Sequence, residues 1–103
     1  LDHANGLNIL GRSYYQQGKM DKAIAVLKEA STIRELNSDP SMLASDYLEL
    51  ADLYLKNNQP RQSITWAKKA EALSEQYDNN LKLSAAYRSL ANAYAASGDH
   101  RNV

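Results

Sequence analysis

The chain contains no cysteine and no phenylalanine, and its 103 residues include only four glycines and two prolines. Without cysteine it can form neither a disulfide nor a thiolate metal site. Its longest purely apolar run covers residues 23–27, too short to span a membrane or to form the core of a signal peptide. Alternating β-branched stretches bounded by turns are also missing, so the sequence predicts no strands.

The chain also has no excess of charge of either sign, because twelve basic residues balance twelve acidic ones. Proteins that bind the phosphate backbone of a nucleic acid usually have an excess of basic residues. We therefore do not expect nucleic acid as a partner. The length suits a single domain over residues 1–103. Since the first residue is Leu1 and not Met, we expect a piece of a longer protein. We expect a cytoplasmic location, or a periplasmic one if an upstream signal was removed.

Residues suited to catalysis are few. The two histidines, His3 and His100, lie near the ends of the chain, and neither has a second ligand at metal-binding spacing. Gly6 and Gly11 do not form a phosphate-binding loop, because no strand precedes them. We therefore expect no catalytic residue, no metal site, no cofactor and no enzyme activity.

One six-residue pattern occurs three times. Residues 10–15 align with residues 50–55 and with residues 90–95, and Tyr14, Tyr54 and Tyr94 are each 40 residues apart. Self-similarity at a fixed period of this size is typical of repeat architectures. The repeats divide the chain into residues 1–37, residues 38–78 and an incomplete third unit at residues 79–103.

Each complete unit is predicted to be a pair of helices, which gives five helices in all. Their expected ranges are about 2–17, 21–36, 40–56 and 60–77, followed by a fifth helix that ends near residue 97. Gly18, Asn57–Asn58 and Gly98 are expected to end helices in the left-handed conformation. Asp39 is a good N-cap, and Pro40 and Pro60 suit the first turn of a helix.

Small residues recur where the helices of a pair should approach closely. Gly11, Ala51 and Ala91 are small residues at the equivalent position of the three units. Large neighbours should fill the grooves beside them, namely the leucines and tyrosines Leu10, Leu50, Leu90, Tyr14, Tyr54 and Tyr94. Trp66 is expected to supply the volume that its small neighbour Ala67 lacks.

These motifs resemble the tetratricopeptide repeat. The first unit reads Leu7-x2-Leu10-Gly11-x2-Tyr14 followed by Ala23-x3-Leu27. The 40-residue period exceeds the usual period of about 34. Repeats this long are similar to those of scaffold proteins and of bacterial sensor kinases and transcription regulators. The resemblance implies an all-α fold, a right-handed α-solenoid of antiparallel helix pairs with about two and a half repeats.

The resemblance also implies a binding surface, because the first helices of successive tetratricopeptide units line a concave face. The side chains expected there form a candidate peptide-binding groove of Asn5, Asn8, Arg12, Tyr15, Gln16, Leu48, Glu49, Asp52, Leu55, Lys56, Arg88 and Asn92. The alternative is an ordinary solvated face whose charges satisfy one another. Asp52 is predicted to pair with Arg12 or Arg88 across the groove.

The expected function is a non-catalytic module that docks a protein or peptide within a larger signalling or regulatory protein. One alternative is a structural spacer that self-associates, and another is a receptor for a small peptide signal. A homo-oligomer is expected to form through the uncapped last helix, by way of Tyr87 and Tyr94.

Overall fold

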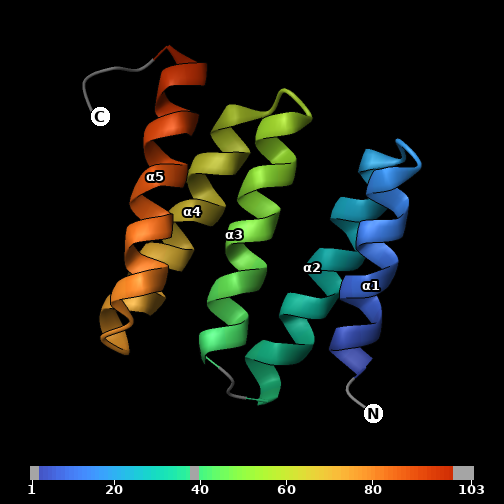
Figure 1. Ribbon diagram of the computed structural model, residues 1–103, viewed down its shortest axis with the longest axis horizontal. Helices are drawn as coiled ribbons and strands as arrows, with labels where there is room; N and C mark the ends of the chain where they lie inside the picture. The colour runs from blue at the N-terminus through green and yellow to red at the C-terminus, as the bar shows by residue number, and fades with distance from the viewer. Residues whose placement is uncertain (1–2, 38–39, 99–103) are drawn as a thin grey trace.

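The computed structural model describes residues 3–37 and 40–98. These residues form five helices and no strand, so the all-α prediction is confirmed (Figure 1). The helices are α1 (His3–Gln16), α2 (Met20–Asn37), α3 (Pro40–Lys56), α4 (Pro60–Gln76) and α5 (Asn80–Ser97). Within the described residues, none of them is long and apolar enough to cross a membrane.

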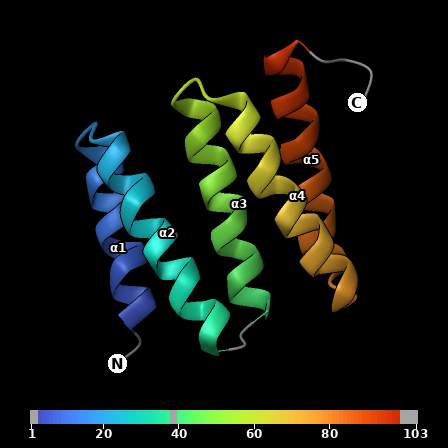
Figure 2. The same cartoon turned by 180° about the vertical axis from the view of Figure 1, so that it is seen from behind.

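The helices stack in two layers. Helix α1 packs against α2, α3 packs against α4, and α5 packs against both α4 and α3. Figures 1 and 2, seen from opposite sides, place α1, α3 and α5 in one layer and α2 and α4 in the other. The shortest axis of the molecule spans 17 Å, about the thickness of two helices. The predicted solenoid of antiparallel helix pairs is therefore confirmed.

Helix ends are set by residues that tolerate a left-handed backbone. Gly18 and Gly98 have φ angles of 78° and 82°, and Asn58 has a φ of 63° between α3 and α4. Asn58 thus replaces a turn glycine, as the sequence predicts. The predicted N-cap at Asp39 lies outside the described residues.

Close approach between paired helices depends on small residues. Gly11 is buried in α1, and a Cβ atom added there would lie 3.1 Å from the Leu27 side chain and 3.2 Å from that of Val26 on α2. Ala51 is fully buried at the same place in α3, and Ala91 is half-buried in α5. The predicted pairing of small residues with close helix contact is confirmed.

Trp66 is the residue that joins most of the core. It is half-buried on α4 and packs against three clusters of buried side chains. The clusters are centred on Leu27, Leu50 and Tyr54, on Leu43, Tyr47, Ala70 and Ala86, and on Ala51, Ala67, Leu90 and Tyr94. One of these clusters contains Ala67, so Trp66 adds volume beside that small residue, as expected.

The prediction that the three repeated leucines all pack in the core is wrong for the first of them, Leu10. Leu50 and Leu90 are 0% and 8% exposed, but Leu10 is 41% exposed. Leu50 packs against Ile24 and Leu27 of α2, the second helix of the preceding pair. Within the described residues no helix pair precedes α1, so Leu10 has no corresponding surface to contact.

Candidate functional site

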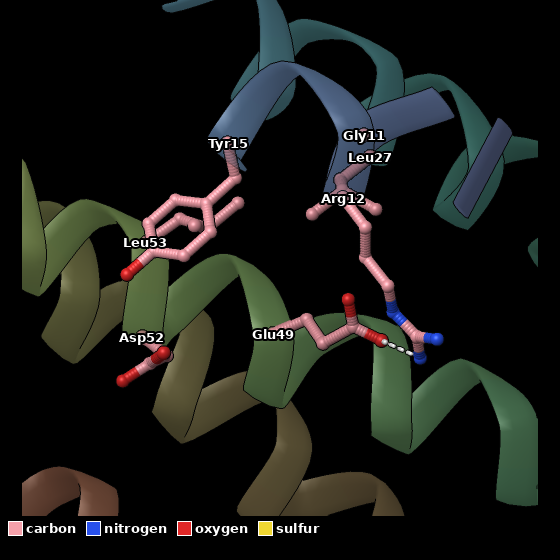
Figure 3. A pocket seen from close by; sticks show the side chains of 7 residues that line it. All are labelled: Gly11, Arg12, Tyr15, Leu27, Glu49, Asp52 and Leu53. Atoms are coloured by element: carbon pink, nitrogen blue, oxygen red, sulfur yellow. Dashed lines mark ion pairs between the residues drawn. The ribbon is translucent and has the colours of Figure 1, made fainter. Parts of the chain in front are cut away.

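Three hollows adjoin one another along the layer of α1, α3 and α5. The Leu27 hollow lies between α1 and α3 (Figure 3) and is lined by Gly11, Arg12, Tyr15, Leu27, Glu49, Asp52 and Leu53. The Arg34 hollow is lined by Asn8, Ile9, Arg12, Arg34, Met42, Ser45, Asp46 and Glu49. The Arg88 hollow is lined by Leu48, Asp52, Leu55, Ala85, Arg88, Ser89 and Asn92.

Shared residues connect these hollows. Arg12 and Glu49 line both the Leu27 hollow and the Arg34 hollow, and Asp52 lines both the Leu27 hollow and the Arg88 hollow. The three hollows therefore border one another across α1, α3 and α5, and together we call them the groove.

A loose ion pair crosses the groove between α1 and α3. Figure 3 shows Arg12 reaching toward Glu49, with 3.9 Å between Nη2 and Oε1 and side chains 71% and 34% exposed. An exposed pair of this kind contributes about 0–1 kcal/mol. Burial raises the pKa of Glu49, and the charge of Arg12 offsets part of that rise.

Asp52 does not form the predicted ion pair with Arg12 or Arg88. Its carboxylate instead lies 3.1 Å from the Lys56 ammonium, one turn further along α3. The prediction is wrong because a lysine four residues away on the same helix is within easy reach, and Arg12 points to Glu49 instead.

Lys56 links the two groove helices at one edge of the Leu27 hollow. Its Nζ atom lies 5.0 Å from the centroid of the Tyr15 ring on α1. The Tyr15 hydroxyl and the Asp52 carboxylate both raise the pKa of Lys56, the hydroxyl most strongly. Lys56 therefore stays charged and holds the Tyr15 ring beside α3.

A buried polar cluster joins α1, α2 and α3 below the Arg34 hollow. Nη1 of Arg34 donates to Oδ1 and Oδ2 of Asp46, at 2.6 and 2.8 Å, and to Oδ1 of Asn8 at 2.8 Å. Nδ2 of Asn8 also donates to Oδ1 of Asp46 at 3.2 Å. Arg34 and Asp46 are only 2% and 1% exposed, so these bonds lie in a low-dielectric interior.

The sequence of this chain matches a family profile over most of its length. The profile of the tetratricopeptide repeat covers residues 2–76. The chain belongs to the tetratricopeptide repeat (TPR) family. TPR units are helix-pair repeats that mediate contacts between proteins. A search of curated protein sequences gave no match.

Solved structures with the same TPR fold include two of one fungal protein. A candidate kinesin light chain from Podosopora anserina, with nearly identical TPR-like repeats, is 21% identical and superposes with a TM-score of 0.82. A variant of that protein gives the same identity and the same TM-score. Each match covers 96% of this chain but only 49% of the other, so this chain spans about half the length of those proteins.

The TPR groove contains nine of the twelve side chains assigned to it from the sequence. These are Asn8, Arg12, Tyr15, Leu48, Glu49, Asp52, Leu55, Arg88 and Asn92. Gln16 and Lys56 are exposed but line none of the three hollows, and the Asn5 side chain lies outside the described part of the chain. Asn8 is only 8% exposed, because its amide is turned into the buried cluster.

Several groove residues were missed from the sequence. Leu27 and Arg34 come from α2, in the layer behind α1 and α3, and they reach the hollows between α1 and α3. Ala85 and Ser89 are small residues of α5 that face α3. Ala85 and Ser89 lie one turn apart on the same side of α5 as Arg88, which was predicted to line the groove. This helical spacing could have identified them from the sequence.

Proposed function

We propose that this TPR domain is a non-catalytic docking module that binds a segment of another protein in the groove. The observation that carries the proposal is that the three hollows, which share Arg12, Glu49 and Asp52, follow one another as a path across α1, α3 and α5. A peptide in extended or helical form can follow such a path with its apolar side chains as anchors.

The lining of the groove supports a protein segment as the ligand. Leu27 and Leu53 provide an apolar floor in the Leu27 hollow, and Leu48 and Leu55 do so in the Arg88 hollow. Charged groups surround these floors in loose or exposed pairs, such as Arg12 with Glu49. Exchanging a weak exposed pair for a partner's group costs little, so these charges can orient a ligand.

The charges of the groove favour recognition over catalysis. The two carboxylates that could act together as acid and base, Glu49 and Asp52, are each paired with a basic side chain. We therefore propose that they orient a bound segment. The long repeat period further favours a place within a larger signalling or regulatory protein. The lack of cysteine fits a reducing cytoplasm, where we propose that this protein acts.

A peptide screen with matched variants tests the docking function. The purified chain would select binders from a phage-displayed library of random peptides, and their affinities would be measured for two leucine-to-lysine variants. Leu55 lines the Arg88 hollow, whereas Leu81 is 85% exposed at the start of α5 and lines none of the three hollows. We expect Leu55→Lys to weaken binding about tenfold or more, equivalent to about 1.4 kcal/mol, and Leu81→Lys to leave it unchanged. Equal affinities for both variants would place the binding surface elsewhere.

Self-association through α5 is a second proposal, supported by exposed aromatic side chains. Tyr87 is 50% exposed on α5, and Tyr77 just before α5 is 54% exposed. Tyr94, expected beside Tyr87 at such an interface, is only 8% exposed because it packs with Ala51 and Ala67, and that part of the expectation is wrong. Light scattering over a range of concentrations tests the rest: Tyr87→Arg should lower the mean mass, and a wild-type chain that stays monomeric at high concentration contradicts it.

A further inference from the structure

The two junctions between neighbouring groove helices have different chemistry at equivalent positions. The α1–α3 junction contains the buried cluster of Asn8, Arg34 and Asp46. Forty residues later, the α3–α5 junction has Leu48, Ser74 and Ala86 in these places. One junction is therefore polar and large, and its counterpart is mostly apolar and small.

The spacing of the helices differs in the same sense. Throughout the described residues the Cα atoms of α1 stay more than 8 Å from those of α3, whereas α3 and α5 approach within that distance. Figures 1 and 2 both show α1 set further from α3 than α5 is. Side chains from α2, Leu27 and Arg34, line the hollows at the wide junction, but the Arg88 hollow at the narrow junction is lined by α3 and α5 alone.

Side-chain size and bonding account for this difference. Arg34 extends from α2 between α1 and α3, where Nη1 binds Asn8 on one side and Asp46 on the other. These bonds fix the guanidinium as a wedge between the two helices. Ser74 is too short to fill the equivalent space, and its buried Oγ has no hydrogen-bond partner in the described structure. Ala86 is fully buried and leaves room for α5 to close on α3.

We propose that Asn8, Arg34 and Asp46 are positioning residues of the groove, which hold α1 away from α3 so that a partner's side chain can enter there as far as Leu27. The helix spacing follows from the fold alone, whereas the entry of a partner's side chain rests on the proposed docking function. The wide junction is thus the anchoring end of the groove, and the narrow junction provides a shallower continuation.

Distances between spin labels test the spacing directly, and the lack of cysteine makes labelling simple. Cysteines would replace Gln16 and Lys56 to measure α1–α3, and Lys56 and Ala96 to measure α3–α5. All three positions are exposed and are equivalent in the repeats. The loss of the Lys56 contacts to Tyr15 and Asp52 is common to the labelled parent and the labelled variant, so it does not affect their comparison. The variant N8L/R34S/D46A gives the first junction the residues of the second. The variant removes Arg34 and Asp46 together, so no charge is left buried without its partner, and we expect it to fold.

The expected result is a shortening of the Gln16–Lys56 label distance by about 2 Å, the range over which side chains set helix spacing. The Lys56–Ala96 distance should remain unchanged. An unchanged Gln16–Lys56 distance in a folded variant would overturn the proposal. Circular dichroism would establish whether the variant is folded.

If the first variant fails to fold, the reverse exchange tests whether these residues set the helix spacing. L48N/S74R/A86D places the polar cluster at the second junction and should lengthen the Lys56–Ala96 distance by a similar amount. No lengthening would show that these residues do not set the spacing. Because neither measurement needs a partner, its outcome is independent of whether the groove binds peptide.

Discussion

Replacing Arg34 by methionine should destabilise the domain by about 3–5 kcal/mol, because it removes one member of a buried ion pair. Methionine fills a similar length but cannot donate the bonds of 2.6 and 2.8 Å to the Asp46 carboxylate. Asp46 is 1% exposed, so its charge would remain in the interior without the guanidinium. Small domains have a total stability of about 5–15 kcal/mol, and the loss is a large part of it.

Two controls separate the effect of burial from that of charge. The double variant R34M/D46L removes both charges and should recover most of the stability, since no uncompensated carboxylate remains. Lys56→Met breaks the exposed pair with Asp52, whose side chains are 49% and 57% exposed, and should cost less than about 1 kcal/mol.

Urea unfolding followed by far-ultraviolet circular dichroism gives these free energies. A loss below about 1 kcal/mol for Arg34→Met, or a double variant no more stable than that single variant, would refute the reasoning. The first result would mean that water solvates Asp46, and the second that the cluster is important for its shape alone.

Other changes have equally direct outcomes. Gly11→Ala should destabilise by about 1–3 kcal/mol in urea unfolding, because its Cβ would meet Leu27 at 3.1 Å. Gly6→Ala, with nothing within 4 Å of its Cβ, should instead stabilise by about 0.5–1 kcal/mol. Tyr54→Ala, at a side chain only 6% exposed, should cost about 3–5 kcal/mol, and a loss below about 1 kcal/mol would remove Tyr54 from the core. Burial raises the pKa of Glu49, so folding favours its protonated form. The stability that Glu49 contributes should decline as the pH rises through its titration, and Glu49→Gln should remove that part of the pH profile.

The sequence predicted the helices well because their signals are local. The expected range of 40–56 coincides with α3, and the other predicted helix ends differ from the observed ones by at most one residue. Pro60 at the start of α4 and Gly18 after α1 act through their own backbone angles, which neighbouring helices do not alter. The 40-residue period then indicated which helices are equivalent.

The candidate groove was only partly predictable, because equivalent positions of the repeats have different neighbours in the structure. Asn8 was assigned to the groove together with Leu48 and Arg88, but its amide bonds to Arg34 in the interior. From the sequence, Arg34 and Asp46 are only two opposite charges on different helices, and nothing indicates that they form an ion pair. Distances between side chains on separate helices decide such bonds, and a single sequence does not contain them.

Trp66 is the only tryptophan, so its fluorescence can report the order in which the helix pairs unfold. Its indole touches clusters at both junctions, with the ammonium groups of Lys28 and Lys69 at 6.0 and 4.6 Å from a ring centroid. The cluster of Leu7 and Ala30 that joins α1 to α2 does not include it. In a linear array whose units hold mainly their neighbours, fraying that begins at α1 lowers helicity while the emission of Trp66 stays constant. Loss of the middle pair changes both signals together, so the lag between them reports where unfolding starts.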